Sequence, residues 1–572
     1  MINWFKKYWV VIILGIIAFL PFSFTLFNPF VSDDWDFLYS AAHKGFSISE
    51  IFSTNNEGNF TGGSYRPLVV IFWRGLYQLV GLHPFAYHLA TTAFHVTNVL
   101  LLYFLIKKIF GKFFDSGRIA SIAAFLFAIS PSRGELAWIS VVNDSLVVLF
   151  ILLTLHTFFV SLEARTNVKR YGFFVLSIVT TFLAFLTKEA ALIIPPTIFM
   201  LVLGYGRVIQ QKFFLRLIRS LVITLPYLFV VVLFFALRYH VIGLLFADYT
   251  GEVKLTLWHV IRSLVSYTFG FFFLGSIRTM ISYFFIKHFV LFILFACVSV
   301  GGIFYLFRKT KIFITTLCAF GLYLISLIPV IRFAINVTPE YISDEGQRYI
   351  YLPSIFLCFC IAVFISHWYG SMTKRQRTYF LVMGIVCSVA LYSQLFCTIH
   401  IWNRASRLAD NLLHQAATIV EKGEYDGYVV VGLPDQYQGA PVFRNVFERA
   451  LSLTLTDPSL PFSSLIVTRN RTLYDPNDMF VVSRTHENSF EYHSLHNLPR
   501  VSSVPEFISS DYVTTLIEHK RLPEAVSVFD VGSGLSLAFS SSFVEHNVEV
   551  HNQIGILFFT SPSWSVVPLS SK

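Results

Sequence analysis

Charged residues are scarce in this sequence. Asp, Glu, Lys and Arg together make up 13% of the 572 residues, whereas hydrophobic residues make up 55%. A soluble domain usually carries about 25% charged residues, which it needs to cover its water-facing surface. The composition therefore excludes an ordinary soluble protein and indicates a chain that is largely embedded in lipid.

The hydrophilic C-terminal part also lacks cysteine, and the sequence as a whole lacks nucleotide-binding motifs. The six cysteines all lie in apolar runs, and the hydrophilic C-terminal part has none, which excludes a disulfide framework or a zinc site there. The sequence has no Gly-x-x-x-x-Gly-Lys-Ser/Thr loop and no dinucleotide fingerprint, which argues against a nucleotide-powered pump. The apolar runs carry no series of charges typical of an ion relay, which argues against transport through their middle.

Long apolar runs, in contrast, are abundant. A helix needs about 20 mostly apolar residues to span a bilayer. Runs of this kind lie near 8–30, 86–106, 119–133, 143–162, 171–187, 190–206, 220–238, 288–307, 312–332, 349–369 and 378–400. The first follows Lys6 and Lys7 and has no small-residue cleavage site after it, which indicates a retained signal anchor. A further stretch, 258–285, is interrupted by glycines and an arginine, so it is a span, a hairpin or an interfacial helix.

The basic residues predict the topology. The formal net charge is +10, but most Lys and Arg lie in five short loops between apolar runs, at 107–118, 165–170, 207–219, 308–311 and 374–377. Because cytoplasmic loops are enriched in Lys and Arg, these loops share a side with the N-terminus if 258–285 does not cross. The acidic residues collect in the opposite loops. We therefore predict about eleven spans, a cytoplasmic N-terminus and no nucleic-acid surface.

The sequence changes character from Trp402 onward. A helical pattern over 403–422 is followed by short β-rich runs that Pro, Gly, Asn and Asp separate. We predict two domains, a transmembrane domain over 1–401 and an extracytoplasmic α/β or β-rich domain over 402–572. The predicted fold is thus mainly α: a polytopic membrane protein with a small β-containing C-terminal domain.

The first predicted outer loop begins with a group of carboxylates. Asp33, Asp34 and Asp36 follow the first span directly, with Trp35 among them. A carboxylate at this position can accept the proton of an attacking hydroxyl, and crowding would raise the pKa of at least one of them. Two alternatives remain open: a solvated acidic end for a helix that begins near Trp35, and a divalent-metal site at Asp34 and Asp36.

Further ionisable residues lie in the other predicted outer loops. They are Arg66, Glu135, Asp144, Lys188, Glu189 and Arg348, the last followed by Tyr349. Ionisable groups at the mouths of spans are candidates for function, and arginine can hold a phosphate through two hydrogen bonds. Each also has a structural alternative. Arg66 could bind lipid headgroups, Lys188 could pair with its neighbour Glu189, and Arg348 could pair with Asp344 or Glu345.

In their order along the chain, these motifs resemble those of the GT-C glycosyltransferases. The branch they resemble is that of the protein O-mannosyltransferases and the tetratricopeptide-bearing transmembrane O-mannosyltransferases. The matching pieces are Asp33-Asp34, Tyr65-Arg66-Pro67-Leu68, the helix with His88 and His95, Ser130 to Ile139 with Asn143-Asp144, Lys188-Glu189, and Arg348-Tyr349-Ile350-Tyr351-Leu352-Pro353. The resemblance covers about the first 400 residues. Tetratricopeptide repeats are missing, and the β-rich C-terminal part stands in their place.

The resemblance implies an inverting transfer of a monosaccharide from a polyprenyl-phosphate donor. The acceptor would be an envelope component or a protein on the extracytoplasmic face of the plasma membrane. Asp34 or Asp33 would be the catalytic base, and Glu135 and Asp144 would shape the acceptor and sugar site. The donor phosphate would be bound by Arg348 with Arg66 and Lys188, and Glu189 and Tyr349 belong to the same predicted site.

The resemblance implies no nucleotide and no metal cofactor, with a divalent metal at Asp34 and Asp36 as the alternative. Two other functions fit the sequence less well. A transporter or flippase of lipid-linked saccharides would show internal repeats or broken helices, and Pro195-Pro196 is the only pronounced break within a predicted span. A non-catalytic membrane scaffold would use its C-terminal part to bind envelope proteins.

Overall fold

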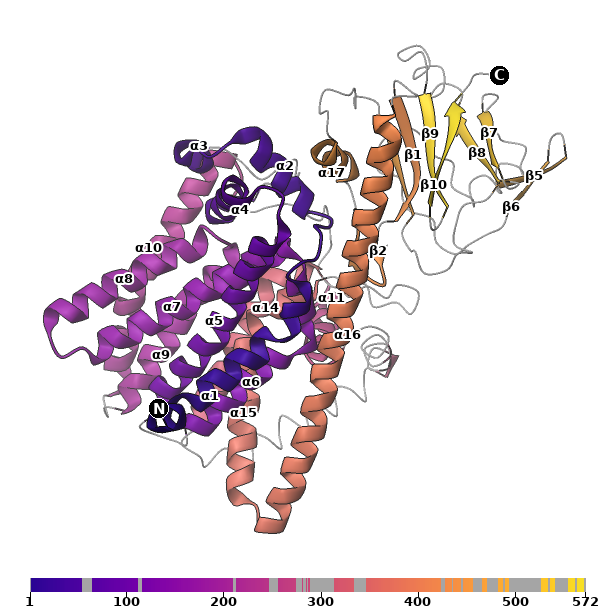
Figure 1. Cartoon of the computed structure of the whole chain (residues 1–572). Helices are drawn as coiled ribbons and strands as arrows, with labels where there is room; N and C mark the ends of the chain where they lie inside the picture. The colour runs from indigo at the N-terminus through magenta and orange to yellow at the C-terminus, as the bar shows by residue number, and fades with distance from the viewer. Residues whose placement is uncertain are drawn as a thin grey trace. The chain divides into compact units, whose positions relative to one another are not determined.

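The computed structural model forms two compact units, drawn in Figure 1. The described residues are 2–53, 64–111, 116–208, 212–245, 256–273, 280, 284, 287–288, 313–333, 346–422, 427–434, 436–443, 446–455 and the later strands given below. The first unit comprises Met1–Phe27 and Ser40–Trp402, and the second comprises Asn28–Tyr39 and Asn403–Lys572. The sequence predicts a boundary near residue 402, but it does not indicate that Asn28–Tyr39 groups with the C-terminal part.

The first unit is helical. Its helices are α1 (Ile2–Phe19), α3 (Ile48–Ser53), α4 (Pro67–Val80), α5 (Pro84–Phe110), α6 (Ser116–Ile129), α7 (Val142–Glu163), α8 (Asn167–Phe185), α9 (Ile194–Val208), α10 (Phe213–Ile242), α11 (Leu257–Gly270), α14 (Phe313–Leu327) and α15 (Pro353–Ser371). Two helices have residues in both units: α2 (Asp34–Lys44) and α16 (Lys374–Glu421). Neighbours along the chain pack together: α5 lies against α6 and α7, α7 against α8, and α9 against α10.

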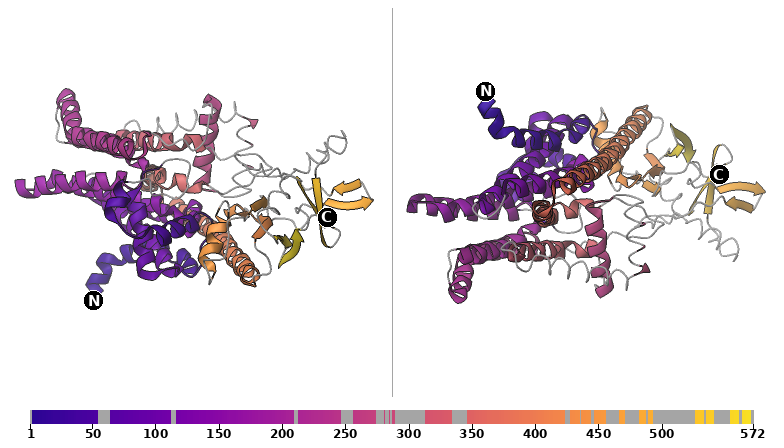
Figure 2. Two further views of the ribbon diagram at one scale, coloured as in Figure 1. Left: turned by 90° about the horizontal axis from the view of Figure 1, so that it is seen from above. Right: turned by 90° about the horizontal axis from the view of Figure 1, so that it is seen from below.

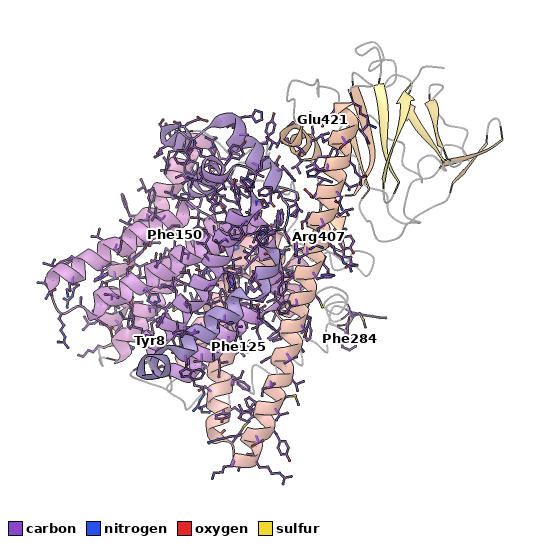
Figure 3. All side chains as sticks on the ribbon, viewed as in Figure 1. Tyr8, Phe125, Phe150, Phe284, Arg407 and Glu421 are labelled. Atoms are coloured by element: carbon purple, nitrogen blue, oxygen red, sulfur yellow. The ribbon has the colours of Figure 1, made fainter. Side chains whose placement is uncertain are left out.

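The core between these helices is apolar. Val147, Val148 and Ile151 of α7 are buried, as are Ala123 and Ala124 of α6. Figure 3 shows side chains filling the space between the helices, with Phe125 of α6 and Phe150 of α7 labelled. α15 completes the packing against both α6 and α14. Burial of such side chains is the main source of cohesion that a helical bundle has beyond its internal hydrogen bonds.

Seven helices among the described residues are long and apolar enough to cross a membrane. They are Tyr8–Thr25, Pro84–Ile109, Ile139–Glu163, Asn167–Phe185, Phe213–Ile242, Pro353–Ser371 and Lys374–Glu421. The prediction of a multi-pass membrane protein is thereby confirmed. Three other predicted spans coincide with the shorter apolar helices Ser116–Ile129, Glu189–Gly204 and Thr316–Ile331. The predicted span 288–307 lies almost wholly outside the described residues, so the number of eleven stays a prediction.

Short 3₁₀ turns at the ends of the long helices carry most of the predicted site residues. They are η2 (Pro131–Ala137), η4 (Glu189–Ile193) and η6 (Gln347–Ile350), and η2 lies against η6. Gly134 permits a close approach in η2, because a side chain there would overlap Thr398 of α16. Gly346 enters η6 with φ 91°, a backbone conformation that glycine adopts without strain.

Strands appear only after residue 426 in the described part of the chain. One sheet has the order β10-β9-β1-β4, from β10 (Ser563–Leu569), β9 (Ile554–Thr560), β1 (Gly427–Pro434) and β4 (Ile466–Asn470). β1 is parallel to both β9 and β4, and β10 is antiparallel to β9. A second sheet has the order β6-β5-β8-β7, from β6 (Ser489–Tyr492), β5 (Val482–His486), β8 (Leu535–Ser540) and β7 (Val526–Gly532). Both sheets are visible in the views of Figure 2.

Before β4, the second unit contains a small hairpin and a helix. The hairpin pairs β2 (Gln436–Tyr437) with β3 (Ala440–Pro441), and the helix is α17 (Phe447–Thr454). Most of 456–525 lies outside the described residues, so a compact β-containing C-terminal domain stays a prediction.

Candidate active site

Seven ionisable side chains of the first unit form a linked set of ion pairs and close charges, which we call the ionic cluster. Its members are the cations Arg66, Lys188, Arg238 and Arg348 and the carboxylates Glu135, Asp144 and Glu189. The four cations come, in the order given, from the residue before α4, the turn after α8, α10 and η6. The three carboxylates come, in the order given, from η2, the first turn of α7 and η4. Six of the seven are among the predicted site residues, and their role in a functional site stays a prediction.

The Lys188–Asp144 pair lies at the centre of the cluster. The ammonium Nζ donates to Asp144 Oδ1 over 2.6 Å, and both side chains are largely buried. Burial lowers the pKa of Lys188, and the guanidinium groups of Arg66 and Arg348 lower it further, against the attraction of Asp144. The second carboxylate oxygen of Asp144, Oδ2, is buried and has no hydrogen-bond partner within the described residues.

Glu189 belongs to a different pair from its neighbour Lys188. Its carboxylate lies 3.5 Å from Arg66 Nη2 and forms a shorter ion pair with Arg238. Lys188 has an extended backbone, with φ −165° and ψ 144°, and successive side chains of an extended chain point to opposite sides. The expected Lys188–Glu189 pair is therefore wrong: Lys188 turns toward Asp144, and Glu189 turns toward the two arginines.

Arg348 is fixed through its backbone and its aromatic neighbours. Its amide donates to Glu135 Oε2 over 2.5 Å. The guanidinium carbon lies 4.9 Å from the centroid of the Trp138 ring and 5.0 Å from that of Tyr349. Lys188 Nζ lies 5.5 Å from the centroid of the same Tyr349 ring, so this ring is close to two cations, which cation–π attraction favours. The alternative partners Asp344 and Glu345 lie outside the described residues.

The charge of the cluster does not cancel. Counted over these seven described residues, four cations and three carboxylates leave a formal excess of one positive charge, 4 − 3 = +1. Partly buried positive charge of this kind is stabilised by a bound anion, and guanidinium groups match the oxygens of a phosphate in geometry as well as in charge. The cluster can therefore bind a phosphate and stabilise negative charge that develops on it.

A buried polar network supports the η6 turn that carries Arg348. The hydroxyl of Tyr351 lies 2.9 Å from His95 Nδ1 and accepts from Asn98 Nδ2 over 3.2 Å. The Arg133 guanidinium lies 4.5 Å from the centroid of the Tyr351 ring and donates to the Ser354 hydroxyl. His95 is thus a buried residue of this network: its Nδ1 is paired, while its Nε2 has no hydrogen-bond partner among the described residues. The network connects α5 and η2 to the beginning of α15.

The acidic turn predicted to hold the base lies in the second unit. Asp34 is only 1% exposed, and its Oδ2 accepts from the amide of Val31 over 3.2 Å, while Asp33 is half-buried. Asp36 forms an ion pair with Arg449, and burial raises the pKa of Asp36 to about 6, against the attraction of that arginine. The alternative of a solvated acidic helix end is therefore wrong for Asp34 and Asp36.

The remaining site predictions are untested. No group of three or more His, Cys, Asp or Glu side chains suited to a metal occurs among the described residues, and the metal alternative at Asp34 and Asp36 stays a hypothesis. The meeting of the acidic turn with the ionic cluster likewise stays a prediction. Two members of these sites, Arg238 and Arg449, were not predicted. Arg238 lies at one end of an apolar run, and the basic residues that flank this run lie at its other end. This asymmetry is a signal that could have identified Arg238.

Residues 65–234 match the family described as dolichyl-phosphate-mannose-protein mannosyltransferase. This segment contains Arg66, Glu135, Asp144, Lys188 and Glu189. The resemblance to the GT-C protein O-mannosyltransferases that the motifs indicated is thereby confirmed over this part of the chain.

A particular relative is the mouse protein O-mannosyl-transferase TMTC3. It is 34% identical over 136 residues, which cover 22% of this chain and 14% of the relative. The chain thus matches about a seventh of the length of this relative.

Two solved structures align with most of this chain at low identity. ArnT from Cupriavidus metallidurans bound to undecaprenyl phosphate aligns with a TM-score of 0.45 and 13% identity, over 78% of this chain and 85% of ArnT. The oligosaccharyltransferase of Archaeoglobus fulgidus, in complex with Zn and sulfate, aligns with a TM-score of 0.39 and 11% identity, over 82% of this chain and 62% of that one. At these values the likenesses add no support to a particular activity.

Proposed function

We propose that this protein is an inverting GT-C-type glycosyltransferase of the plasma membrane. It moves a monosaccharide from a polyprenyl-phosphate donor to an envelope or protein acceptor on the extracytoplasmic face. In this proposal the chain has about eleven spans, a cytoplasmic N-terminus and a small extracytoplasmic β-containing domain at its C-terminal end.

The observation that carries the proposal is the ionic cluster with its excess of one positive charge. Lys188 and Arg348, on separate turns, lie 5.5 Å and 5.0 Å from the centroid of the same Tyr349 ring. A leaving lipid phosphate gains negative charge as its bond to the sugar breaks, and preorganised cations stabilise that charge more than they stabilise the intact donor. The family matched over residues 65–234 is named for a dolichyl-phosphate-mannose donor, which makes a polyprenyl-phosphate hexose the first donor to test.

The reaction requires a base as well as a phosphate site. An acceptor hydroxyl oxygen attacks the anomeric carbon from the face opposite the phosphate, and the bond between that carbon and the phosphate oxygen breaks. The hydroxyl proton passes to the carboxylate of Asp34 or Asp33, and polyprenyl phosphate leaves with the bonding electron pair. Inversion follows from this single displacement. The lipid tail of the donor stays in the bilayer, so the apolar helices contribute to donor binding.

The experiment that tests the proposal is donor turnover by the purified chain in lipid vesicles. The vesicles contain one polyprenyl-phosphate sugar at a time, from a panel of hexoses and pentoses, and envelope extract supplies acceptors. The expected result is release of polyprenyl phosphate and labelling of an acceptor with one of these sugars. Asp34→Asn or Asp33→Asn should abolish release while membrane insertion is retained. Movement of the intact donor across the bilayer without release would instead establish a flippase. If the chain neither releases polyprenyl phosphate nor moves the donor, the non-catalytic scaffold is the remaining function.

A further inference from the structure

We infer that a segment of the C-terminal part positions the acidic turn that carries the proposed base. The segment consists of β3, Val442, Phe443 and α17, and we call it the C-terminal clasp. The inference rests on the proposed function, because it assigns the clasp a role in the same reaction. It gives Asp36 and Arg449 the role of positioning residues, while the chemistry belongs to Asp33 and Asp34.

The first contact of the clasp fixes the backbone just before the two candidate bases. The amide of Ser32 donates to the carbonyl of Val442 over 2.7 Å. Ser32 has φ 47°, in the left-handed region that residues other than glycine avoid, and its side chain is fully buried. Such strained backbone persists where the surrounding structure enforces it, and it is concentrated at functional sites. The hydrogen bond from Ser32 to Val442 is a specific device that holds this conformation.

The second contact lies just after the candidate bases. Arg449 of α17 forms an ion pair with Asp36, whose side chain is 9% exposed. The same guanidinium lies 5.8 Å from the centroid of the Tyr39 ring, one turn further along α2. Arg449 therefore contacts two successive turns of the helix that begins at Asp34. Because Asp36 is already paired with a cation, it is better suited to fixing this helix than to accepting a proton.

A third contact holds the entry to the turn. Asn28 Nδ2 donates to Asn403 Oδ1 over 2.6 Å. Contacts at positions 28, 32 and 36 are thus spaced four residues apart, and the last two lie on either side of Asp33 and Asp34. All three partners come from residues after 402, which are separated from the turn by more than 370 residues of sequence.

The clasp has its own apolar core, so it can act as a rigid support. Four of its apolar residues are at most 1% exposed: Val442, Phe443, Phe447 and Leu451. The rings of Phe443 and Phe447 meet edge to face with centroids 4.9 Å apart. Catalytic groups must be held to within a fraction of an ångström of the productive geometry, and this requires packed supporting residues. The clasp provides such packing to the residues just before α2 and to the first turn of that helix.

A positioning role predicts a particular kinetic signature. In this inference the clasp acts on the turn with the base and not on the donor phosphate, so its loss should reduce kcat and leave the donor KM nearly unchanged. Arg449→Gln and Asp36→Asn should each lower kcat about tenfold or more, since misplacement by about 1 Å can cost a factor of 100. The double variant should lose no more than either single variant, because both remove one interaction. Arg449→Lys, which keeps the charge, should recover part of the rate.

The experiment measures initial rates of transfer and hydrogen exchange of the full-length chain in lipid nanodiscs. The matched control is Arg407→Gln on α16, an exposed arginine in the same unit (labelled in Figure 3). In Arg449→Gln, amides of residues 32–37 should exchange at least about tenfold faster than in the wild type, and in Arg407→Gln they should not. Additive losses in the double variant, a change confined to donor KM, or unchanged exchange in Arg449→Gln would each overturn the inference.

The hydrogen-exchange result separates this inference from the proposed function. If the wild type transfers no sugar from any donor, the proposed function fails, but faster exchange in Arg449→Gln alone would still establish that the clasp holds the turn. If the wild type transfers sugar and Arg449→Gln retains full kcat, the proposed function stands and the positioning role is wrong.

Discussion

The ammonium of Lys188 lies 2.6 Å from Asp144 Oδ1, which joins the turn after α8 to the first turn of α7. Both groups are largely buried, and further cations surround the pair. A buried pair contributes little net stability, but removal of one partner costs about 3–5 kcal/mol, because the other charge is left uncompensated. In the proposed function, the charges of this pair act on a third group, the phosphate of the bound donor.

This explanation predicts that stability and donor binding can be separated at this pair. Lys188→Met should lower the thermal stability of the chain in detergent and abolish transfer, since Asp144 is left buried and unpaired. Lys188→Met combined with Asp144→Asn should regain most of the stability, but its donor KM should remain at least about tenfold above that of the wild type. A double variant with both the donor KM and the kcat of the wild type would show that the pair has only a structural role.

Arg348 should contribute mainly to the rate of the chemical step. Arg348→Gln removes the guanidinium from the faces of Trp138 and Tyr349 but leaves the backbone amide that Glu135 accepts from. Loss of one preorganised group that stabilises developing charge costs a factor of about 100 to 1,000 in kcat. Arg348→Lys should lose less. Transfer assays in vesicles test this, with Lys169→Gln in a predicted cytoplasmic loop as the control, and equal activity of Arg348→Gln and the control would contradict it.

The pH dependence should depend on Asp36. Burial raises the pKa of this carboxyl to about 6, so acidification through pH 6 removes its negative charge and weakens its pairing with Arg449. The rate of transfer should therefore fall as the pH is lowered through about 6. In Asp36→Asn the fall in transfer rate near pH 6 should be missing from the pH–rate profile. If the fall persists in that variant, a group other than Asp36 causes it.

The stability of the chain should change in the opposite direction over the same range. In the unfolded chain the pKa of Asp36 is near its ordinary value of 3.8, well below the value of about 6 in the folded chain. Its contribution to stability is therefore fully present below about pH 3.8 and is lost as the pH rises through 6. A comparison of thermal unfolding at pH 5 and pH 7 for the wild type and Asp36→Asn isolates this contribution. A wild type that loses stability, relative to the variant, on going from pH 7 to pH 5 would contradict the raised pKa.

The network below Arg348 gives a prediction about stability. Tyr351→Phe removes the hydroxyl that contacts both His95 and Asn98, and leaves these buried polar groups without that partner. The expected cost is about 1–3 kcal/mol in the free energy of unfolding. Tyr369→Phe on α15 serves as the control, because no hydrogen bond of its hydroxyl is among the contacts described. Equal melting temperatures for the two variants would show that the network does not support the η6 turn.

Much of the ionic cluster could be predicted from the sequence. Ionisable residues at the outer ends of apolar helices are few, and an apolar chain has little reason to place them there except to meet one another or a ligand. Arg66, Asp144 and Arg348 were found in this way. The order of their motifs along the chain also indicated the family that residues 65–234 match.

The pairing within the cluster could not be predicted. Lys188 and Glu189 are neighbours in sequence, but the extended backbone at Lys188 turns their side chains in opposite directions. Arg238 was hidden because it closes an apolar run and was counted as part of a span. The ion pair between Asp36 and Arg449 joins residues 413 positions apart, and no local pattern of residues encodes a contact at that separation. The β-rich character of the C-terminal part likewise gave no sign that residues 28–39 fold with it.

The central claim is that the acidic turn and the ionic cluster face one phosphate-binding site on the outer side of the membrane. The most direct measurement is an electron cryo-microscopy structure of the full-length chain in a nanodisc with polyprenyl phosphate. The phosphate oxygens should lie at hydrogen-bond distance, about 3 Å, from Lys188 and Arg348, with the carboxylate of Asp33 or Asp34 facing the same cavity. A phosphate bound elsewhere, or an acidic turn that faces away from this cavity, would contradict the claim.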